Sequence, residues 1–307
     1  MNTFGNKFSV SIFGESHGER IGVTVDGVQP GLPLGMEDLM PDLARRKAGA
    51  KGTTPRVETD LPEIVSGVYE GHTTGAPLTI LFKNENTRSG DYAGFRDNPR
   101  PGHADRTASI KFQGCNDPRG GGHFSGRITL GVVAAGVIAK KMAPYRYEAK
   151  IVELGGRTDG WPEALEQAQA EGDSLGAVVE CRVDGVPAGL GEPFWDSVES
   201  RLAHALFAIP GVRGVEFGDG FQAARMKGSE HNDAYAPGQV APLTNHAGGV
   251  NGGITNGNPL VFRVAFKPTA SIAKAGIPGR HDTCFALRTP VIVEAMAAIV
   301  LAGFLND

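Results

Sequence analysis

The chain has 307 residues, of which 40% are hydrophobic and 21% charged, with a formal net charge of −4. These proportions exclude an intrinsically disordered chain, and the charge excludes a general attraction to nucleic acid or to an anionic membrane surface. The longest uninterrupted apolar stretch, residues 295–305, is shorter than the roughly 20 residues that a membrane-spanning helix needs.

The first residues contain no apolar run of signal-peptide length. Cys115, Cys181 and Cys284 are far apart and have neither a pairing pattern nor zinc-ligand spacing. We therefore expect a cytoplasmic protein without disulfides and without a bound metal ion.

Alternating apolar and polar residues predict strands over 8–13 and 21–25, and the second runs into Asp26-Gly27, a dipeptide typical of a hairpin turn. The segment GESHG (14–18) lies between these two strands. Glycines on both sides would allow His17 to approach a ligand closely. A turn histidine bonded within its own loop is the alternative interpretation.

Apolar residues at helical spacing predict an amphipathic helix over 36–47, with acidic residues in its first turn and basic residues in its last. This helix runs into the basic segment RRKAGAKGTTPR (45–56). Its positive charges could clamp phosphate or carboxylate oxygens. They could equally form a solvated helix end.

Two further strands are predicted over 63–69 and 78–83, and a polar stretch without periodicity follows over 84–106. Long irregular segments in folded chains often serve a functional site. This one ends in RPGHADR (100–106), where a histidine lies close to a carboxylate and to arginines, as acid–base and anion-binding sites require. An exposed polar loop remains the alternative.

The segment RGGGHFSGR (119–127) leads into a stretch of small apolar residues, which predicts a buried helix over 125–142. The glycines let backbone N–H groups converge, Ser125 is a candidate N-cap, and a helix N-terminus favours an anion. The segment lacks both the P-loop ending and the GxGxxG pattern, so it predicts a phosphate site without a nucleotide signature. A plain turn is the alternative.

In the second half, helices are predicted over 163–171, 194–209 and 290–305, and strands over 177–183 and 261–266. Two more loops hold candidate residues: GGVNGGITNG (248–257), followed by KPTAS (267–271), and GRHDTC (279–284). Hairpin turns and a surface ion pair would also explain them. Without a βαβ rhythm, a repeat or a linker, the class is α+β and residues 1–307 form a single domain.

Taken together and in this order, GESHG, RPGHAD, GGITNG with KPTAS, and GRHDTC resemble the chorismate synthase family over nearly the whole chain. The resemblance implies a helical core sandwiched between antiparallel sheets, a β-α-β sandwich, and a homotetramer. The apolar helices over 125–142 and 290–305 agree with an oligomer, because they offer more apolar surface than we expect one chain to cover.

The resemblance also implies a carbon–oxygen lyase of the shikimate pathway, in aromatic amino acid biosynthesis. Its substrate would be 5-enolpyruvylshikimate 3-phosphate, and an anti 1,4-elimination of phosphate would give chorismate. The family requires reduced FMN as a cofactor although no net redox change occurs. Whether the protein reduces its own flavin with NAD(P)H stays open.

Residue roles follow from the resemblance. His17 would donate a proton to the departing phosphate, His103 would manage protonation of the reduced flavin, and Asp282 would act with the flavin N5 on the substrate proton. The implied substrate-binding residues are Ser16, Arg45, Arg46, Lys51, Arg100 and Arg127. The implied flavin contacts are His123, Phe124, Ser125, Pro210, Gly211, Gly252, Lys267, Pro268, Thr269, Ala270, Ser271 and Arg280.

This chain departs from the family pattern at several positions. Many members read GGRSSARET where this chain has GGHFSGRIT, so His123 replaces an arginine and Ile128 an acidic residue. RRKAG stands in place of RRRPG, and RHDTC in place of RHDPC.

Two other kinds of protein remain as alternatives. A metal-dependent hydrolase could use His17, His103, Asp105, His281 and Asp282, since histidine and aspartate mixtures also ligate metals. A non-catalytic flavin-binding module would leave the basic segment and the histidines without an evident use.

Overall fold

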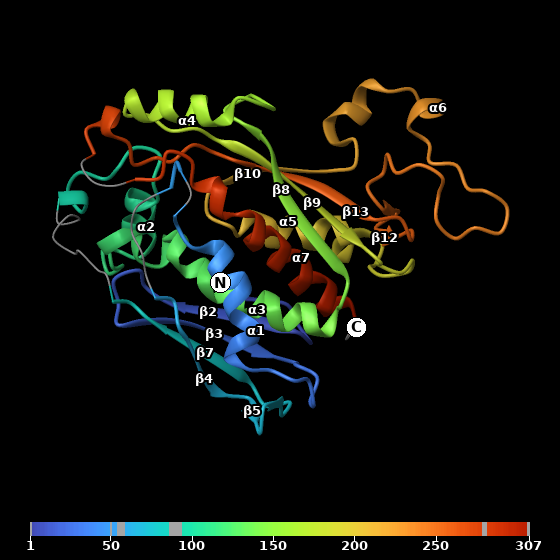
Figure 1. Cartoon of the computed structure of the whole chain (residues 1–307), viewed down its shortest axis with the longest axis horizontal. Coiled ribbons are helices and arrows are strands. Elements are labelled where there is room, and N and C mark those ends of the chain that lie inside the picture. Colours follow the sequence, from blue (N-terminus) through green and yellow to red (C-terminus); the bar gives the residue numbers. More distant parts are fainter. Residues whose placement is uncertain (1, 50, 54–58, 86–93, 278–280, 306–307) are drawn as a thin grey trace.

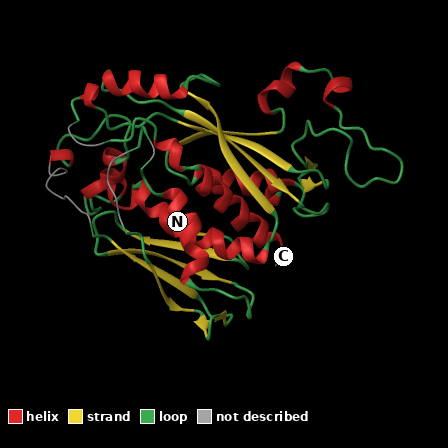
Figure 2. Ribbon diagram, viewed as in Figure 1, coloured by secondary structure: helices red, strands yellow, loops and turns green. Residues whose placement is uncertain are grey.

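The structure is a computed structural model that describes residues 2–49, 51–53, 59–85, 94–277 and 281–305. Two antiparallel sheets and a set of helices make up most of it (Figures 1 and 2). The first sheet has, in spatial order, β1 (Thr3–Phe4), β2 (Ser9–Gly14), β3 (Arg20–Asp26), β7 (Leu78–Lys83) and β4 (Pro62–Ser66). The second has β10 (Val212–Phe217), β13 (Leu260–Phe266), β9 (Ala177–Asp184) and β8 (Arg146–Leu154). Two short hairpins are β5 (Val68–Tyr69) with β6 (His72–Thr73), and β11 (Val250–Asn251) with β12 (Ile254–Thr255).

The α-helices are α1 (Met36–Arg46), α2 (Asp105–Lys111), α3 (Thr129–Met142), α4 (Trp161–Ala170), α5 (Val198–Phe207), α6 (Gly228–His231) and α7 (Pro290–Leu305). Short 3₁₀ turns include Arg119–Phe124, Gly126–Ile128, Phe194–Asp196 and Phe285–Arg288. Helix α3 packs against β3 of the first sheet, α7 packs against β8 and β9 of the second, and α3 and α7 pack against each other. Helices α3 and α7 therefore lie between the two sheets (Figure 2).

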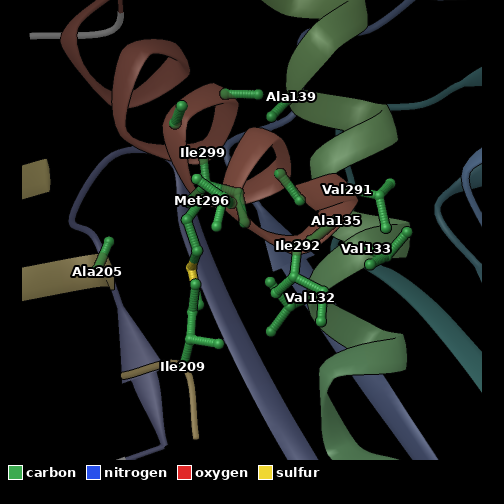
Figure 3. Close-up of a cluster of buried hydrophobic side chains, with 14 of the residues drawn as sticks. Val132, Val133, Ala135, Ala139, Ala205, Ile209, Val291, Ile292, Met296 and Ile299 are labelled. Atoms are coloured by element: carbon green, nitrogen blue, oxygen red, sulfur yellow. The ribbon is translucent and has the colours of Figure 1, made fainter. Parts of the chain in front are cut away.

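Helices α3 and α7 form the centre of the core because neither has a polar face. Every residue of α3 from 129 to 139 and every residue of α7 from 291 to 304 is buried, as expected for helices that are apolar all round. Figure 3 shows side chains of both helices, among them Val132 and Met296, in one cluster. Gly136 allows the close approach, since a Cβ atom there would lie 2.3 Å from Ala295 Cβ.

The structure confirms the α+β class and most predicted elements. All strand pairs in the described ranges are antiparallel. The predicted elements found in nearly the predicted place are 8–13, 21–25, 36–47, 78–83, 125–142, 163–171, 177–183, 261–266 and 290–305.

Some predictions about the elements were wrong. Asp26-Gly27 does not close a hairpin, because β3 pairs with β2 through the preceding turn and next with the distant β7. The strand over 63–69 is divided at Gly67, whose φ is +85° and where a Cβ would lie 2.5 Å from Leu78 Cα. The helix over 194–209 is divided at Ser197, which caps α5. Strands β8 and β10 were not predicted.

The expectation that α3 and α7 offer more apolar surface than one chain covers was also wrong. Both helices are covered within this single chain by the two sheets and by α1 and α5. The exposed apolar side chains lie elsewhere, most of all at Phe194 and Trp195, which are 83% and 89% exposed.

Candidate active site

The turn between β2 and β3 holds His17 against the glycine run 120–122. The three glycines have φ values of +60°, +83° and +54°, in the left-handed region that favours glycine. A Cβ atom on Gly120 would lie 2.5 Å from His17 Cδ2 and 2.7 Å from Ser16 Oγ. The Ser16 backbone N–H donates to the Gly122 carbonyl at 3.0 Å. The glycine run thus provides the space that the buried His17 ring occupies.

His103 lies against the next glycine of the same run. A Cβ atom on Gly121 would be 3.4 Å from His103 Nε2. On the other side of the ring, His103 Nδ1 is 2.6 Å from Asp105 Oδ1. Because the two histidines contact successive glycines, the structure brings together the GESHG and RPGHAD segments, which are more than 80 residues apart in the chain.

Asp105 is held by Arg100 as well as by His103. The Arg100 guanidinium donates to both carboxylate oxygens at 2.8 Å, and its backbone N–H adds a third bond at 3.0 Å. Burial favours the neutral acid, but the hydrogen bonds from Arg100 and His103 outweigh it and hold the pKa of Asp105 well below its usual range. The ionised carboxylate therefore fixes the orientation of the His103 ring.

A second group of charges, here called the arginine cluster, consists of Arg46, Arg127 and Arg288 with the carboxylates of Asp60 and Asp282. Arg127 Nη1 donates to Asp60 Oδ1, Arg46 Nη1 is 3.9 Å from Asp60 Oδ2, and Arg288 Nη2 donates to Asp282 Oδ2 at 2.5 Å. Burial lowers the pKa of Arg46 to about 9, with repulsion from Arg288 and Arg127 adding to the effect and attraction to the two carboxylates opposing it.

Asn84 connects the arginine cluster to the His17 loop. Its Oδ1 accepts a hydrogen bond from Arg127 Nε at 2.9 Å. Its Nδ2 donates to the carbonyls of Glu15 and Gly18, at 3.1 Å and 2.8 Å, on the two sides of His17. The Asn84 side chain thus fixes the His17 loop relative to the buried guanidinium of Arg127.

The segment 267–271 runs beside the His103 loop. Ser271 Oγ accepts a hydrogen bond from Arg100 Nη1 at 3.3 Å, and Lys267 Nζ donates to the Gly102 carbonyl. The Lys267 backbone N–H donates to the Gly211 carbonyl at 2.9 Å, which brings Gly211 and its neighbour Pro210 to the same segment. Thr269 Oγ1 is buried and has no hydrogen-bond partner among the described residues.

Phe124 and Ser125 follow the glycine run. Phe124 is exposed, and it lines a cavity together with His103 and Asp105. The Ser125 hydroxyl accepts a hydrogen bond from the Arg127 backbone N–H at 3.3 Å, so it caps the turn before α3 as predicted.

Several predicted site residues have their side chains bonded to other parts of the protein. Arg45 forms a two-bond ion pair with Glu294 of α7, at 2.7 and 2.8 Å. Lys51 pairs with Glu166 of α4.

His123, another predicted contact, bonds through Nδ1 to the Gly14 carbonyl at 2.7 Å and through Nε2 to Asn2 at 3.1 Å. Gly252 lies in the β11–β12 hairpin, on the opposite side of the molecule from α2 (Figure 1). Arg280 lies outside the described residues.

Three residues of this site were missed by the sequence analysis: Asp60, Asn84 and Arg288. Asn84 begins the predicted irregular segment, and Arg288 stands just before the last helix, but neither is part of a recognisable motif. Asp60 follows the basic segment and belongs to no motif that would mark it as a site residue.

Comparison with known proteins gives consistent matches. A family model of chorismate synthase matches residues 8–305. The chain is 59% identical to the chorismate synthase of Chitinophaga pinensis, over 99% of this chain and 96% of that protein. It is 44% identical to the chorismate synthase of Thermococcus gammatolerans, over 98% and 96%. A crystal structure of chorismate synthase superimposes with a TM-score of 0.78 and 28% identity, over 98% of this chain and 92% of that one.

Proposed function

The chain belongs to the chorismate synthase family, and from this membership we propose how its residues share the reaction. The enzyme is a carbon–oxygen lyase that removes phosphate from 5-enolpyruvylshikimate 3-phosphate by anti 1,4-elimination and so forms chorismate, on the route to aromatic amino acids. The observation that supports a complete site is the position of His17 and His103 on the neighbouring glycines Gly120 and Gly121.

Arg46 and Arg127 bind the anionic groups of the substrate. Both guanidinium groups are buried, and charge-assisted hydrogen bonds are strong where water is excluded. The hydrogen bonds to Thr129, Asn84 and Asp60 fix both groups before substrate arrives. Donors that are already in place stabilise the negative charge that grows on the departing phosphate.

Arg45 and Lys51 have supporting roles in this proposal. Their charged groups already pair with Glu294 and Glu166. Arg45 fixes the last turn of α1, from which Arg46 extends. Arg100 acts on the His103 side, where it holds Asp105.

His17 protonates the departing phosphate. His17 is 6% exposed, and its ring lies against Gly120 beside the Ser16 hydroxyl. A general acid in this position needs close contact with the leaving group and little competition from water. Ser16 supplies a further hydrogen-bond donor at the same place.

His103 moves protons on the cofactor side of the site. The contact between its Nδ1 and Asp105 leaves Nε2 facing the glycine run. Because Asp105 fixes the ring, Nε2 is the atom through which His103 takes up and passes on a proton in this proposal. Asp282 accepts the proton that the substrate loses, and Arg288 orients its carboxylate.

The residues beside His103 fit reduced FMN. The buried Thr269 hydroxyl, which lacks a partner among the described residues, offers a hydrogen bond to a bound polar group. Lys267, Ser271, Phe124 and Ser125 would complete the contact. His123 is less suited, because Gly14 and Asn2 already engage its ring nitrogens. When bound, reduced FMN supplies electron density that assists loss of the allylic phosphate without net redox change.

The test is phosphate release from 5-enolpyruvylshikimate 3-phosphate under anaerobic conditions. We expect many turnovers per flavin with reduced FMN and none with oxidised FMN. Turnover with oxidised FMN, or with added metal and no flavin, would overturn the assignment. Turnover supported by NADPH and FMN alone would show that the chain reduces its own flavin.

His17→Ala should lower the rate of the chemical step by about 10²–10⁴-fold and leave FMN affinity nearly unchanged. His72→Ala is the control, because that exposed histidine bonds only to its own turn, at the Glu70 carbonyl. A His17→Ala enzyme with the wild-type rate at every pH would remove His17 from the mechanism.

The same membership leads us to propose that residues 1–307 work as one β-α-β sandwich domain, as a homotetramer in the cytoplasm. No helix within the described ranges is both long and apolar enough to cross a membrane. The small anionic substrate, and neither nucleic acid nor membrane, is the partner that the site accommodates.

A further inference from the structure

The Asp60 carboxylate lies buried between two arginines that come from different parts of the chain. It is 3% exposed. One oxygen accepts a hydrogen bond from Arg127 at the end of the glycine-rich segment, and the other faces Arg46 at the end of α1. We propose that Asp60 is a positioning residue for the elimination: it holds these two guanidinium groups ready for the substrate, and its charge weakens their affinity for free phosphate. The inference rests on the proposed substrate-binding role of Arg46 and Arg127.

The two arginines are held in different ways. Arg127 uses all three nitrogens, because Nε donates to Asn84, Nη1 to Asp60, and Nη2 to the Lys83 carbonyl at 3.2 Å. Arg127 is therefore fixed in place, and Asp60 is one of its three anchors.

Arg46 keeps one nitrogen available. Its Nε donates to Thr129 Oγ1 at 3.0 Å, and its Nη2 donates to the Gly126 carbonyl at 2.9 Å. Its Nη1 faces Asp60 at 3.9 Å, which is beyond hydrogen-bond distance. Nη1 makes no hydrogen bond to any described residue, so an anion beside Asp60 could accept both of its N–H groups.

The charges explain why a carboxylate is needed at this point. Arg46, Arg127 and Arg288 carry three positive charges, and Asp60 and Asp282 carry two negative ones. Without Asp60 the buried guanidinium groups would repel each other more strongly and would turn away from their present arrangement. The same negative charge repels an incoming anion. A substrate with several contacts can overcome this repulsion, whereas free phosphate, which is also a product, is released more easily.

The backbone conformation at Asp60 makes Asp60→Asn a suitable test of the carboxylate charge. Its φ is +52°, a left-handed conformation that aspartate and asparagine tolerate better than most residues. Asp60→Asn therefore removes the charge and keeps both the backbone preference and the size of the side chain. Asp184→Asn is a matched control, because Asp184 also pairs with an arginine, Arg182, but on the exposed side of β9.

The experiment measures turnover with reduced FMN and, separately, binding of inorganic phosphate by calorimetry. For Asp60→Asn we expect kcat to fall by at least about tenfold, because the arginines are no longer aligned, and phosphate to bind at least about threefold more tightly, because a repelling charge is gone. Asp184→Asn should leave both quantities unchanged. A merely structural role would weaken phosphate binding together with turnover.

Either of two results would overturn the inference: unchanged turnover in Asp60→Asn, or phosphate binding that is unchanged or weaker. If Asp60→Asn does not fold, Asp60→Glu serves as the test. Glutamate keeps the negative charge, but its longer side chain shifts the carboxylate relative to the two arginines. We then expect wild-type phosphate affinity with at least about threefold lower turnover, and wild-type turnover would refute the positioning role. If the wild-type enzyme itself does not convert the substrate, the proposed function fails, while the phosphate measurement still tests the effect of the Asp60 charge.

Discussion

At the scale of single residues, Asp282 has a partner that its own motif does not contain. Its carboxylate binds Arg288, six residues further along the chain and just before α7. Burial lowers the pKa of Arg46, and attraction to the Asp282 carboxylate works against this effect. Asp282 therefore belongs to the arginine cluster. A base at this position would be held by an arginine and still lie near the groups that bind the substrate.

Asp282→Asn should lower kcat by at least about 10²-fold with little change in substrate or flavin affinity, because an amide cannot take up the proton. Arg288→Lys is the companion variant: it keeps the charge near Asp282, so its loss of rate should be much smaller. An Asp282→Asn enzyme with unimpaired turnover would reduce Asp282 to a structural partner of Arg288.

A second prediction at the residue scale concerns Asp105 and the pH dependence of the protein's stability. Hydrogen bonds from Arg100 and His103, acting against burial, depress the pKa of Asp105 in the folded protein. A carboxyl group with a depressed pKa stabilises the fold at pH values above the pKa that it has in the unfolded chain, which is near 4. The stabilisation is lost as the pH falls from there toward the depressed value.

Asp105→Asn should therefore lower the free energy of unfolding at pH 7 by about 3 kcal/mol, since it leaves the buried Arg100 without its counter-charge. The difference from wild type should shrink as the pH is lowered from about 4 toward 3. Urea unfolding across this range measures it, with Asp184→Asn as the exposed control. An equal difference at pH 3 and pH 7 would contradict the assigned role of the carboxylate.

At the scale of elements, the contact between α3 and α7 fixes the centre of the molecule. A side chain on Gly136 would overlap both Cα and Cβ of Ala295, at 2.6 Å and 2.3 Å. Overlap with a backbone atom cannot be relieved by a change of rotamer, so the helices themselves would have to separate.

Gly136→Ala should destabilise the protein by about 1–3 kcal/mol, even though alanine favours a helix more than glycine does. Gly228→Ala in α6 is the control: a Cβ atom there meets nothing within 4 Å, so the effect should stay within about 0.5 kcal/mol. Thermal or urea unfolding measures both. An equally stable Gly136→Ala protein would mean that the two helices are packed less tightly than the structure indicates.

At the scale of the whole molecule, the apolar surface left exposed lies away from the core helices. Phe194 and Trp195 are adjacent and almost fully exposed, and Phe194 has a φ of +65°, which is unusual for an aromatic residue. Exposed neighbouring aromatic side chains are typical of surfaces that another protein covers.

Light scattering at micromolar concentration should therefore give about four times the mass of one chain, as the proposed homotetramer requires. The measurement should be repeated on Phe194→Ser/Trp195→Ser, which should shift the protein toward smaller species if these side chains are covered. A wild-type protein that is monomeric and fully active would refute the tetramer.

Elements whose pattern is local could be predicted from the sequence alone. Helix α7 was predicted with its observed limits, because a continuous apolar run after a proline needs no distant contact to be recognised. Strand β8 was missed although charged and apolar residues alternate over 146–151, and the register shift between Ile151 and Glu153 then breaks this alternation. The order of motifs also indicated the family, which the comparisons then confirmed.

Which of the candidate residues come into contact depends on how the chain folds in three dimensions. Arg45 and Arg46 are adjacent in sequence, but each step along a helix turns the side chain by about 100°, so Arg45 reaches Glu294 while Arg46 reaches Thr129 and faces Asp60. Asp60 and Asn84 act through contacts with Arg127, which is distant in the chain. A residue whose role depends on such long-range contacts leaves no local periodicity or spacing, and for that physical reason the sequence could not reveal it.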